Sequence, residues 1–96
     1  MNSVAILGKR TKQPDEILDY DVNYDEWFSN RTDTPASYTV DAETGITLVS
    51  DDLAGNVVRV VLGGGTAGES YKITVLLTTS DGIVKEADFV VKVKAV

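Results

Sequence analysis

The chain has 96 residues, of which 43% are hydrophobic and 25% charged, a composition that suits one small folded domain. Its net charge of −6 and isoelectric point near 4.4 exclude nucleic acid and anionic membrane surfaces as expected partners, because like charges repel. Cysteine and histidine are absent, which excludes disulfides, thiolate metal sites and the commonest general base.

The first 13 residues are predicted to form an N-terminal arm or linker. Val4 and Ile6 lie in a four-residue apolar run that we expect to contact a partner or add a short strand. The run is too short for the core of a signal peptide, and basic residues follow it instead of preceding it, so no signal peptide is expected. Gly8–Lys12 is predicted to be a mobile basic linker. The folded domain is expected over residues 14–96.

Residues 18–24 alternate between apolar and polar side chains, which predicts a half-buried strand with its carboxylates in water. Residues 25–29 are expected to form at most one helical turn, and Trp27 is expected to cover the core beside this strand. The polar segment 29–37 is predicted to be a loop. Its residues Arg31, Thr32 and Pro35 are candidates for contact with a partner.

The middle of the chain predicts three short strands, over residues 38–40, 46–49 and 57–62, with a polar turn over residues 51–56. In the third strand, Val58 and Val60 are expected to face inward and Arg59 to face solvent. Val57 and Val61 would then form a modest exposed apolar strip beside Arg59. This strip is another candidate contact surface.

A glycine-rich turn at residues 63–68 precedes a strand that begins with Tyr71, which is typical of the corner tyrosine of immunoglobulin-like sandwiches. The last two strands alternate strongly and flank the turn residues 80–82. A three-residue loop there pairs Val75 with Ala87 and keeps both inward-facing sets on one side, whereas a two-residue turn would pair inward with outward residues. Together, six or seven short strands predict an all-β, immunoglobulin- or fibronectin-like antiparallel sandwich.

Three segments resemble ligand-binding motifs, and each lacks what the chemistry needs. Residues 63–70 approach a phosphate-binding loop, but Glu69 stands where a lysine must attract the phosphates. Asp19, Asp21 and Asn23 open like a calcium loop without its glycine and final glutamate. The acidic turn at residues 51–56 is interpreted as an ordinary polar turn. We therefore expect no catalytic residues, no metal and no cofactor.

Two parts of the chain resemble a family of small virion-associated proteins of tailed bacteriophages, described as fibre–tail adaptors with an immunoglobulin-like fold. The first part reads Lys12-x-Pro14-x-Glu16-x-Leu18-Asp19-Tyr20-x-Val22, followed by Trp27. The second reads Gly64-Gly65-Thr66-Ala67-Gly68-x-x-Tyr71-x-Ile73-Thr74 and extends through the strand pair joined at residues 80–82. The resemblance covers about residues 12–93.

The resemblance implies a non-enzymatic structural protein that is assembled in the host cytoplasm and docks onto tail, neck or fibre components of the virion. Its partners would be other virion structural proteins, with a homo-oligomer in a symmetric assembly as a further expectation. An alternative is an immunoglobulin-like module that binds carbohydrate or a host-surface ligand, which exposed aromatic side chains such as Trp27 and Tyr38 would favour. A third class, a hydrolase, would need a pocket with facing carboxylates.

Overall fold

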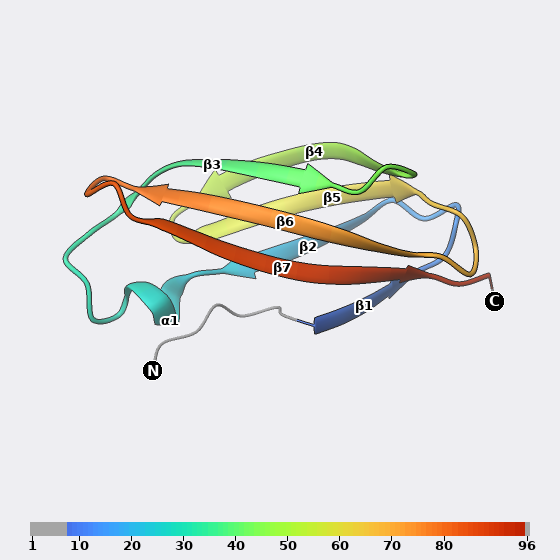
Figure 1. The fold of residues 1–96 in the computed structure, drawn as a ribbon, viewed down its shortest axis with the longest axis horizontal. Coiled ribbons are helices and arrows are strands. Elements are labelled where there is room, and N and C mark those ends of the chain that lie inside the picture. The colour runs from blue at the N-terminus through green and yellow to red at the C-terminus, as the bar shows by residue number, and fades with distance from the viewer. Residues whose placement is uncertain (1–7, 96) are drawn as a thin grey trace.

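A computed structural model describes residues 8–95, which form seven strands and one short helix (Figure 1). The elements are β1 (Gly8–Lys12), β2 (Leu18–Asn23), α1 (Asp25–Phe28), β3 (Pro35–Ala42), β4 (Ile46–Ala54), β5 (Val57–Gly64), β6 (Ser70–Thr79) and β7 (Val84–Val93). They build two sheets, in the orders β1-β7-β6-β3 and β2-β5-β4. The two sheets face each other, so the predicted all-β sandwich is confirmed.

The strand order follows the immunoglobulin pattern with one difference. β2, β5 and β4 take the places of immunoglobulin strands B, E and D, and β3, β6 and β7 take those of C, F and G. The first strand, β1, joins the second of these sheets and pairs with β7 in parallel, whereas the other pairings are antiparallel. The chain therefore crosses from one sheet to the other between β1 and β2.

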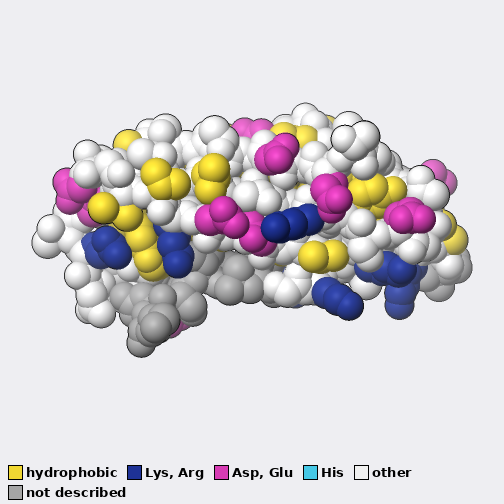
Figure 2. All heavy atoms as spheres, viewed as in Figure 1, with side chains coloured by type: hydrophobic (Ala, Val, Ile, Leu, Met, Phe, Trp, Pro, Cys, Tyr) yellow, Lys and Arg dark blue, Asp and Glu magenta, His cyan; other side chains and the backbone are white. Residues whose placement is uncertain are grey.

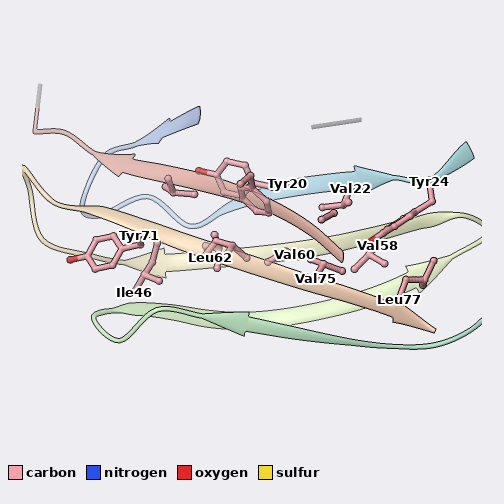
Figure 3. Close-up of a cluster of buried hydrophobic side chains, with 14 of the residues drawn as sticks. Tyr20, Val22, Tyr24, Ile46, Val58, Val60, Leu62, Tyr71, Val75 and Leu77 are labelled. Atoms are coloured by element: carbon pink, nitrogen blue, oxygen red, sulfur yellow. The ribbon is translucent and has the colours of Figure 1, made fainter. Parts of the chain in front are cut away.

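The core lies between the sheets and is built by the alternation that the sequence predicted. The inward side chains of β2, β5, β6 and β7 are buried, while the residues between them face solvent. Figure 3 shows this interior, with Tyr71 and Ile46 at one end and Tyr24 and Leu77 at the other. The buried hydrophobic residues are Tyr20, Val22, Tyr24, Trp27, Phe28, Ile46, Val58, Val60, Leu62, Tyr71, Ile73, Val75, Leu77, Ala87, Phe89, Val91 and Val93.

Tyr71 is the corner tyrosine that the sequence predicted. Its hydroxyl oxygen accepts a hydrogen bond from the backbone N–H of Thr66 at 2.8 Å, which ties the β5–β6 turn to the start of β6. Two glycines make room for the ring: a Cβ on Gly45 would lie 2.8 Å from Tyr71, and one on Gly65 would lie 3.3 Å from it. Both glycines have positive φ angles, which other residues adopt at a cost.

The three-residue loop between β6 and β7 is confirmed. Val75 pairs with Ala87 and Ile73 with Phe89, as the loop predicts. The backbone N–H of Thr79 donates to the carbonyl of Ile83 at 2.8 Å, so residues 80–82 form the loop. Gly82 occupies the left-handed position at φ 86°.

Three segment predictions are wrong. Gly8–Lys12 was predicted to be a linker but forms β1. Its partner, Phe89–Val93, lies far away in the sequence, so this pairing cannot be inferred from local composition. β3 begins at Pro35, inside the predicted loop. β4 extends to Ala54, so Asp51 and Asp52 lie in a strand instead of a turn; a bulge between Leu48 and Ser50 hides its alternation.

Candidate docking surfaces

Lys12 fixes one end of the sandwich. Only 2% of this side chain is exposed, and its ammonium nitrogen donates to three backbone carbonyls, those of Gln13 at 2.7 Å, Pro14 at 3.2 Å and Gly64 at 2.6 Å. These contacts join β1, the turn after it and the end of β5. A buried ammonium needs such partners, since an unsatisfied charge in the interior is costly. These contacts therefore hold the end of β1 against the β5–β6 turn.

The outer edge of β1 is partly capped by side chains. The carbonyl of Thr11 accepts from the hydroxyl of Tyr20 at 3.3 Å, and the carbonyl of Lys9 accepts from Nη1 of Arg10 at 3.0 Å. An edge strand whose carbonyls are engaged, and which carries several cations, is a poor template for another strand. β1 therefore presents its side chains more than its backbone for any contact.

The outer face of the β2-β5-β4 sheet carries the predicted strip on β5. Arg59 is exposed, as predicted, and lies between Asp19 and Asp21, with its Nε 2.8 Å from Asp21. The guanidinium, hydrogen-bonded to Asp21, holds the pKa of that carboxyl below its usual range. Val57 and Val61 are half-buried on either side of Arg59, so the strip exposes less apolar surface than a fully outward pair would.

Two residues on this face were missed by the sequence analysis. Ile17 and Val49 are 64% and 50% exposed, and a Cβ on Gly63 would lie 3.4 Å and 3.3 Å from them, respectively. They therefore lie over Gly63 and beside Val61, where they enlarge the apolar area. The bulge after Leu48 breaks the alternation of β4, so a period of two could not assign Val49 to a face.

The segment from Arg31 to Pro35 lies at the opposite end from Tyr71, against the β6–β7 hairpin. The carbonyl of Thr34 accepts from the N–H of Ser80 at 2.9 Å, and Asp33 Oδ1 accepts from the N–H of Asp81 at 3.2 Å. The guanidinium of Arg31 lies 4.2 Å from the centre of the Trp27 ring. Thr32 is exposed, whereas Pro35 is half-buried at the start of β3.

The hairpin itself adds apolar surface at that end. Ile83 is 44% exposed and Val84 57% exposed, beside the ordered segment that contains Arg31. Figure 2 shows hydrophobic side chains next to Lys and Arg side chains at this end of the β1-β7-β6-β3 sheet, the front sheet in that view. Val4 and Ile6 lie outside the described residues, so their role as contacts stays a prediction.

The aromatic side chains offer little surface for stacking. Trp27 and Phe28 from α1 are buried, as are Tyr20 and Tyr24, so the prediction that Trp27 covers the core beside the strand of residues 18–24 is confirmed. Tyr38, in β3, is half-buried, and its hydroxyl donates a hydrogen bond of 2.6 Å to Asp51 in β4 of the other sheet. This hydrogen bond to a carboxylate raises the pKa of Tyr38 to about 12.

Neither a cluster of metal ligands nor a membrane-spanning helix is found in the described part of the chain. Residues 8–95 contain no cluster of three or more acidic side chains placed to hold a metal ion. In the same range the single helix, α1, has four residues and cannot cross a bilayer. What these residues do present is a set of separate polar and apolar surfaces on a well-packed body.

The comparisons with known proteins identify the family. No curated protein sequence matches the chain. The family model described as podophage GP4 fiber-tail adaptor protein gp77 matches residues 12–92, which is most of the chain and includes all seven strands in whole or part. The chain therefore belongs to the gp77 family of podophage fiber-tail adaptor proteins, which are structural, non-enzymatic components of the virion.

Proposed function

We propose that this protein joins a fibre to the tail of a podophage particle by docking the two ends of its sandwich onto different virion proteins. The observation that carries the proposal is the family match over residues 12–92. The first end, called the hairpin end, comprises residues 31–35 and 80–84. The second, called the corner end, comprises β1, the β5–β6 turn and the end of β7. Figure 1 places the β6–β7 hairpin at one extreme of the long axis and the β5–β6 turn and the end of β7 at the other, with β1 running from the middle toward that second end.

The hairpin end has the properties of a protein interface. Ile83 and Val84 expose apolar surface, and Arg31, in the segment hydrogen-bonded to the hairpin, places its guanidinium over Trp27. Interface centres are enriched in apolar and aromatic residues and in arginine. The hydrogen bonds of Thr34 and Asp33 to the hairpin order this end before a partner arrives, which lowers the entropy lost on docking.

The outer face of the β2-β5-β4 sheet is a second apolar surface, formed by Ile17, Val49, Val57 and Val61. We assign it to contacts between neighbouring subunits in the particle, where symmetric repetition multiplies weak interactions. Val57 and Val61, which the sequence singled out, lie in it. The burial of Trp27 and Phe28 argues against the alternative of a carbohydrate-binding module, because stacking on a sugar needs an exposed ring face.

A capture experiment tests the proposal. The purified protein is immobilised and mixed separately with the tail and fibre proteins of the phage that encodes it. We expect both to be retained. The double variant Ile83→Asp/Val84→Asp should bind one of the two proteins with an affinity lower by about tenfold or more, since buried apolar anchors dominate interface energies. The control variant Thr39→Asp adds charge at an exposed position of β3, away from the hairpin end.

The control is expected to retain both partners. Melting temperatures of the variants within a few degrees of each other would show that the sandwich is intact. Retention of neither tail nor fibre protein by the unmodified chain would contradict the proposed function. Sedimentation of the protein alone and of the captured complexes measures whether copies associate, as the proposed subunit contacts require.

A further inference from the structure

The cations of this acidic protein are distributed unevenly. It has nine Lys and Arg residues. Arg59 pairs with Asp19 and Asp21, Lys72 pairs with Asp88 at 3.6 Å, Lys12 is buried on carbonyls and Arg31 lies over Trp27. The remaining five have no side-chain carboxylate of residues 8–95 within salt-bridge distance: Lys9, Arg10, Lys85, Lys92 and Lys94.

Four of these five cations line one hollow at the corner end. The hollow has a volume of about 330 Å³ and is lined by Lys9, Arg10, Thr11, Ser70, Lys92 and Lys94. Its lining contains two hydroxyl groups and no carboxylate. Figure 2 shows dark-blue Lys and Arg side chains gathered on this side of the front sheet, below acidic and apolar side chains. We call these four cations and the space between them the basic hollow.

The basic hollow is held in shape by contacts on both sides. Nζ of Lys92 donates to the carbonyl of Gly68 at 2.7 Å, and the N–H of Gly68 donates to the carbonyl of Val93 at 2.8 Å. The corner turn thus fixes the end of β7, and the Lys12 ammonium fixes β1 on the other side. Four like charges kept together repel one another, so an anionic occupant stabilises the arrangement.

We propose that the basic hollow docks a carboxylate-rich segment of a partner protein, which is held by the four cations and by the hydroxyls of Thr11 and Ser70. The inference rests on the proposed function for the kind of partner, a virion protein, and on the hollow for its chemistry. Three of the cations, Lys9, Arg10 and Lys94, lie outside the residues that the family model matches. They supply a docking property that membership of the family does not assign.

Charge also decides between a protein and a nucleic acid as the occupant. The whole chain has a net charge of −6 even with these four cations included, so a long polyanion that extends beyond the hollow meets repulsion within a Debye length of about 8 Å at physiological salt. A short acidic segment that ends inside the hollow avoids it. The basic hollow is therefore the place where most of the unpaired cations gather, and docking of an acidic segment there favours one orientation as well as a faster rate.

The test uses octaglutamate as the probe and an eight-nucleotide oligothymidylate as the competing polyanion. Fluorescence anisotropy of each labelled probe gives its affinity for the full chain at 20 mM and 150 mM salt. The variant Arg10→Gln/Lys94→Gln removes two charges from the hollow, and the control Arg59→Gln/Lys85→Gln removes two charges away from it, one on β5 of the other sheet and one near the start of β7. We expect the first variant to weaken octaglutamate binding about fivefold and the control less than twofold, since exposed ion pairs contribute little individually.

Amide chemical shifts of the unmodified chain supply a second measurement that needs no variant. The shifts that octaglutamate moves should belong to β1, the β5–β6 turn and the end of β7. Equal losses in the two variants, oligothymidylate binding as tight as octaglutamate binding, or shifts that map elsewhere would each overturn the inference. If the chain captures fibre and tail proteins but does not bind octaglutamate, the inference is overturned and the proposed function stands. If it binds octaglutamate but captures neither protein, the proposed function is overturned and the charge preference of the hollow stands.

Discussion

Replacement of Tyr71 or Tyr24 by Phe removes one hydroxyl from the core, and the two substitutions are expected to change the free energy of unfolding in opposite directions. The hydroxyl of Tyr71 accepts the N–H of Thr66 at 2.8 Å. Tyr24 is fully buried, and its hydroxyl has no hydrogen-bond partner among residues 8–95. Burial and the nearby Asp88 carboxylate raise the pKa of Tyr24 to about 12, because both disfavour the phenolate. Replacement of each by Phe therefore removes a partnered hydroxyl in one case and an unpartnered one in the other.

The magnitudes follow from what each hydroxyl does. Tyr71→Phe removes a hydrogen bond and leaves the N–H of Thr66 without its acceptor, so it should lower the free energy of unfolding by about 1.5 kcal/mol. In a domain of this size that corresponds to a fall in melting temperature of about 6–12 °C. Tyr24→Phe removes a polar group that is costly to bury, so it should raise the free energy of unfolding by about 1 kcal/mol.

Urea titration followed by the fluorescence of Trp27, the single tryptophan, measures both changes, and calorimetry gives the melting temperatures. Tyr38→Phe is the matched control, because its hydroxyl contacts Asp51 at an exposed position, where about 0.5 kcal/mol or less is expected. If Tyr24→Phe destabilised the protein as much as Tyr71→Phe, the assignment of Tyr24 as an unpartnered hydroxyl would be wrong. A Tyr71→Phe variant as stable as the parent would refute the role of the corner.

Three further changes test other contacts. Gly65→Ala should lower the free energy of unfolding by at least about 2 kcal/mol, because its Cβ would lie 2.7 Å from Val93 at φ 92°. The control Gly82→Ala, with φ 86° and no atom within 4 Å, should lower it by only about 1 kcal/mol. Equal urea midpoints for the two variants would contradict this. Lys12→Met should destabilise the protein by about 2 kcal/mol in the same assay, since three carbonyls lose their donor; an unchanged midpoint would mean that they find another. Ultraviolet titration should place the ionisation of Tyr38 at pH about 12, and Asp51→Asn should lower this pKa; an unaltered titration in that variant would exclude Asp51 as the cause. The stability that this hydrogen bond contributes is present below pH 10 and is lost as the pH rises toward 12.

The parts of the fold that depend on local pattern could be predicted from the sequence. The alternation of β2, β6 and β7 fixed which side chains face inward, and the residues at 80–82 fixed the register of the last hairpin. The Tyr71 corner was predictable because a glycine-rich turn and a tyrosine at the start of a strand form one local unit. Each of these features needs only neighbouring residues, and each is confirmed.

The parts that depend on distant pairing could not be predicted. β1 is polar and short, and it is a strand because it lies beside Phe89–Val93, about 80 residues along the chain. The bulge in β4 shifts its alternation, which hid both its length and the exposure of Val49. The basic hollow depends on the first of these pairings, since Lys9 and Arg10 meet Lys92 and Lys94 only when β1 joins β7. No signal within either segment alone points to it.

The way these elements are joined supports the proposal that so small a protein holds two partners in a fixed geometry. β6 and β7 run from the hairpin end to the corner end and pair over their length without a bulge. A displacement of one end must therefore stretch a continuous ladder of hydrogen bonds or shear the packed core beneath it, and packed cores resist both. The Tyr71 corner and the Lys12 ammonium fasten the second end to the same ladder. With no cysteine in the chain, this packing replaces covalent cross-links as the source of stiffness, which is the mechanical property that an adaptor between fibre and tail requires.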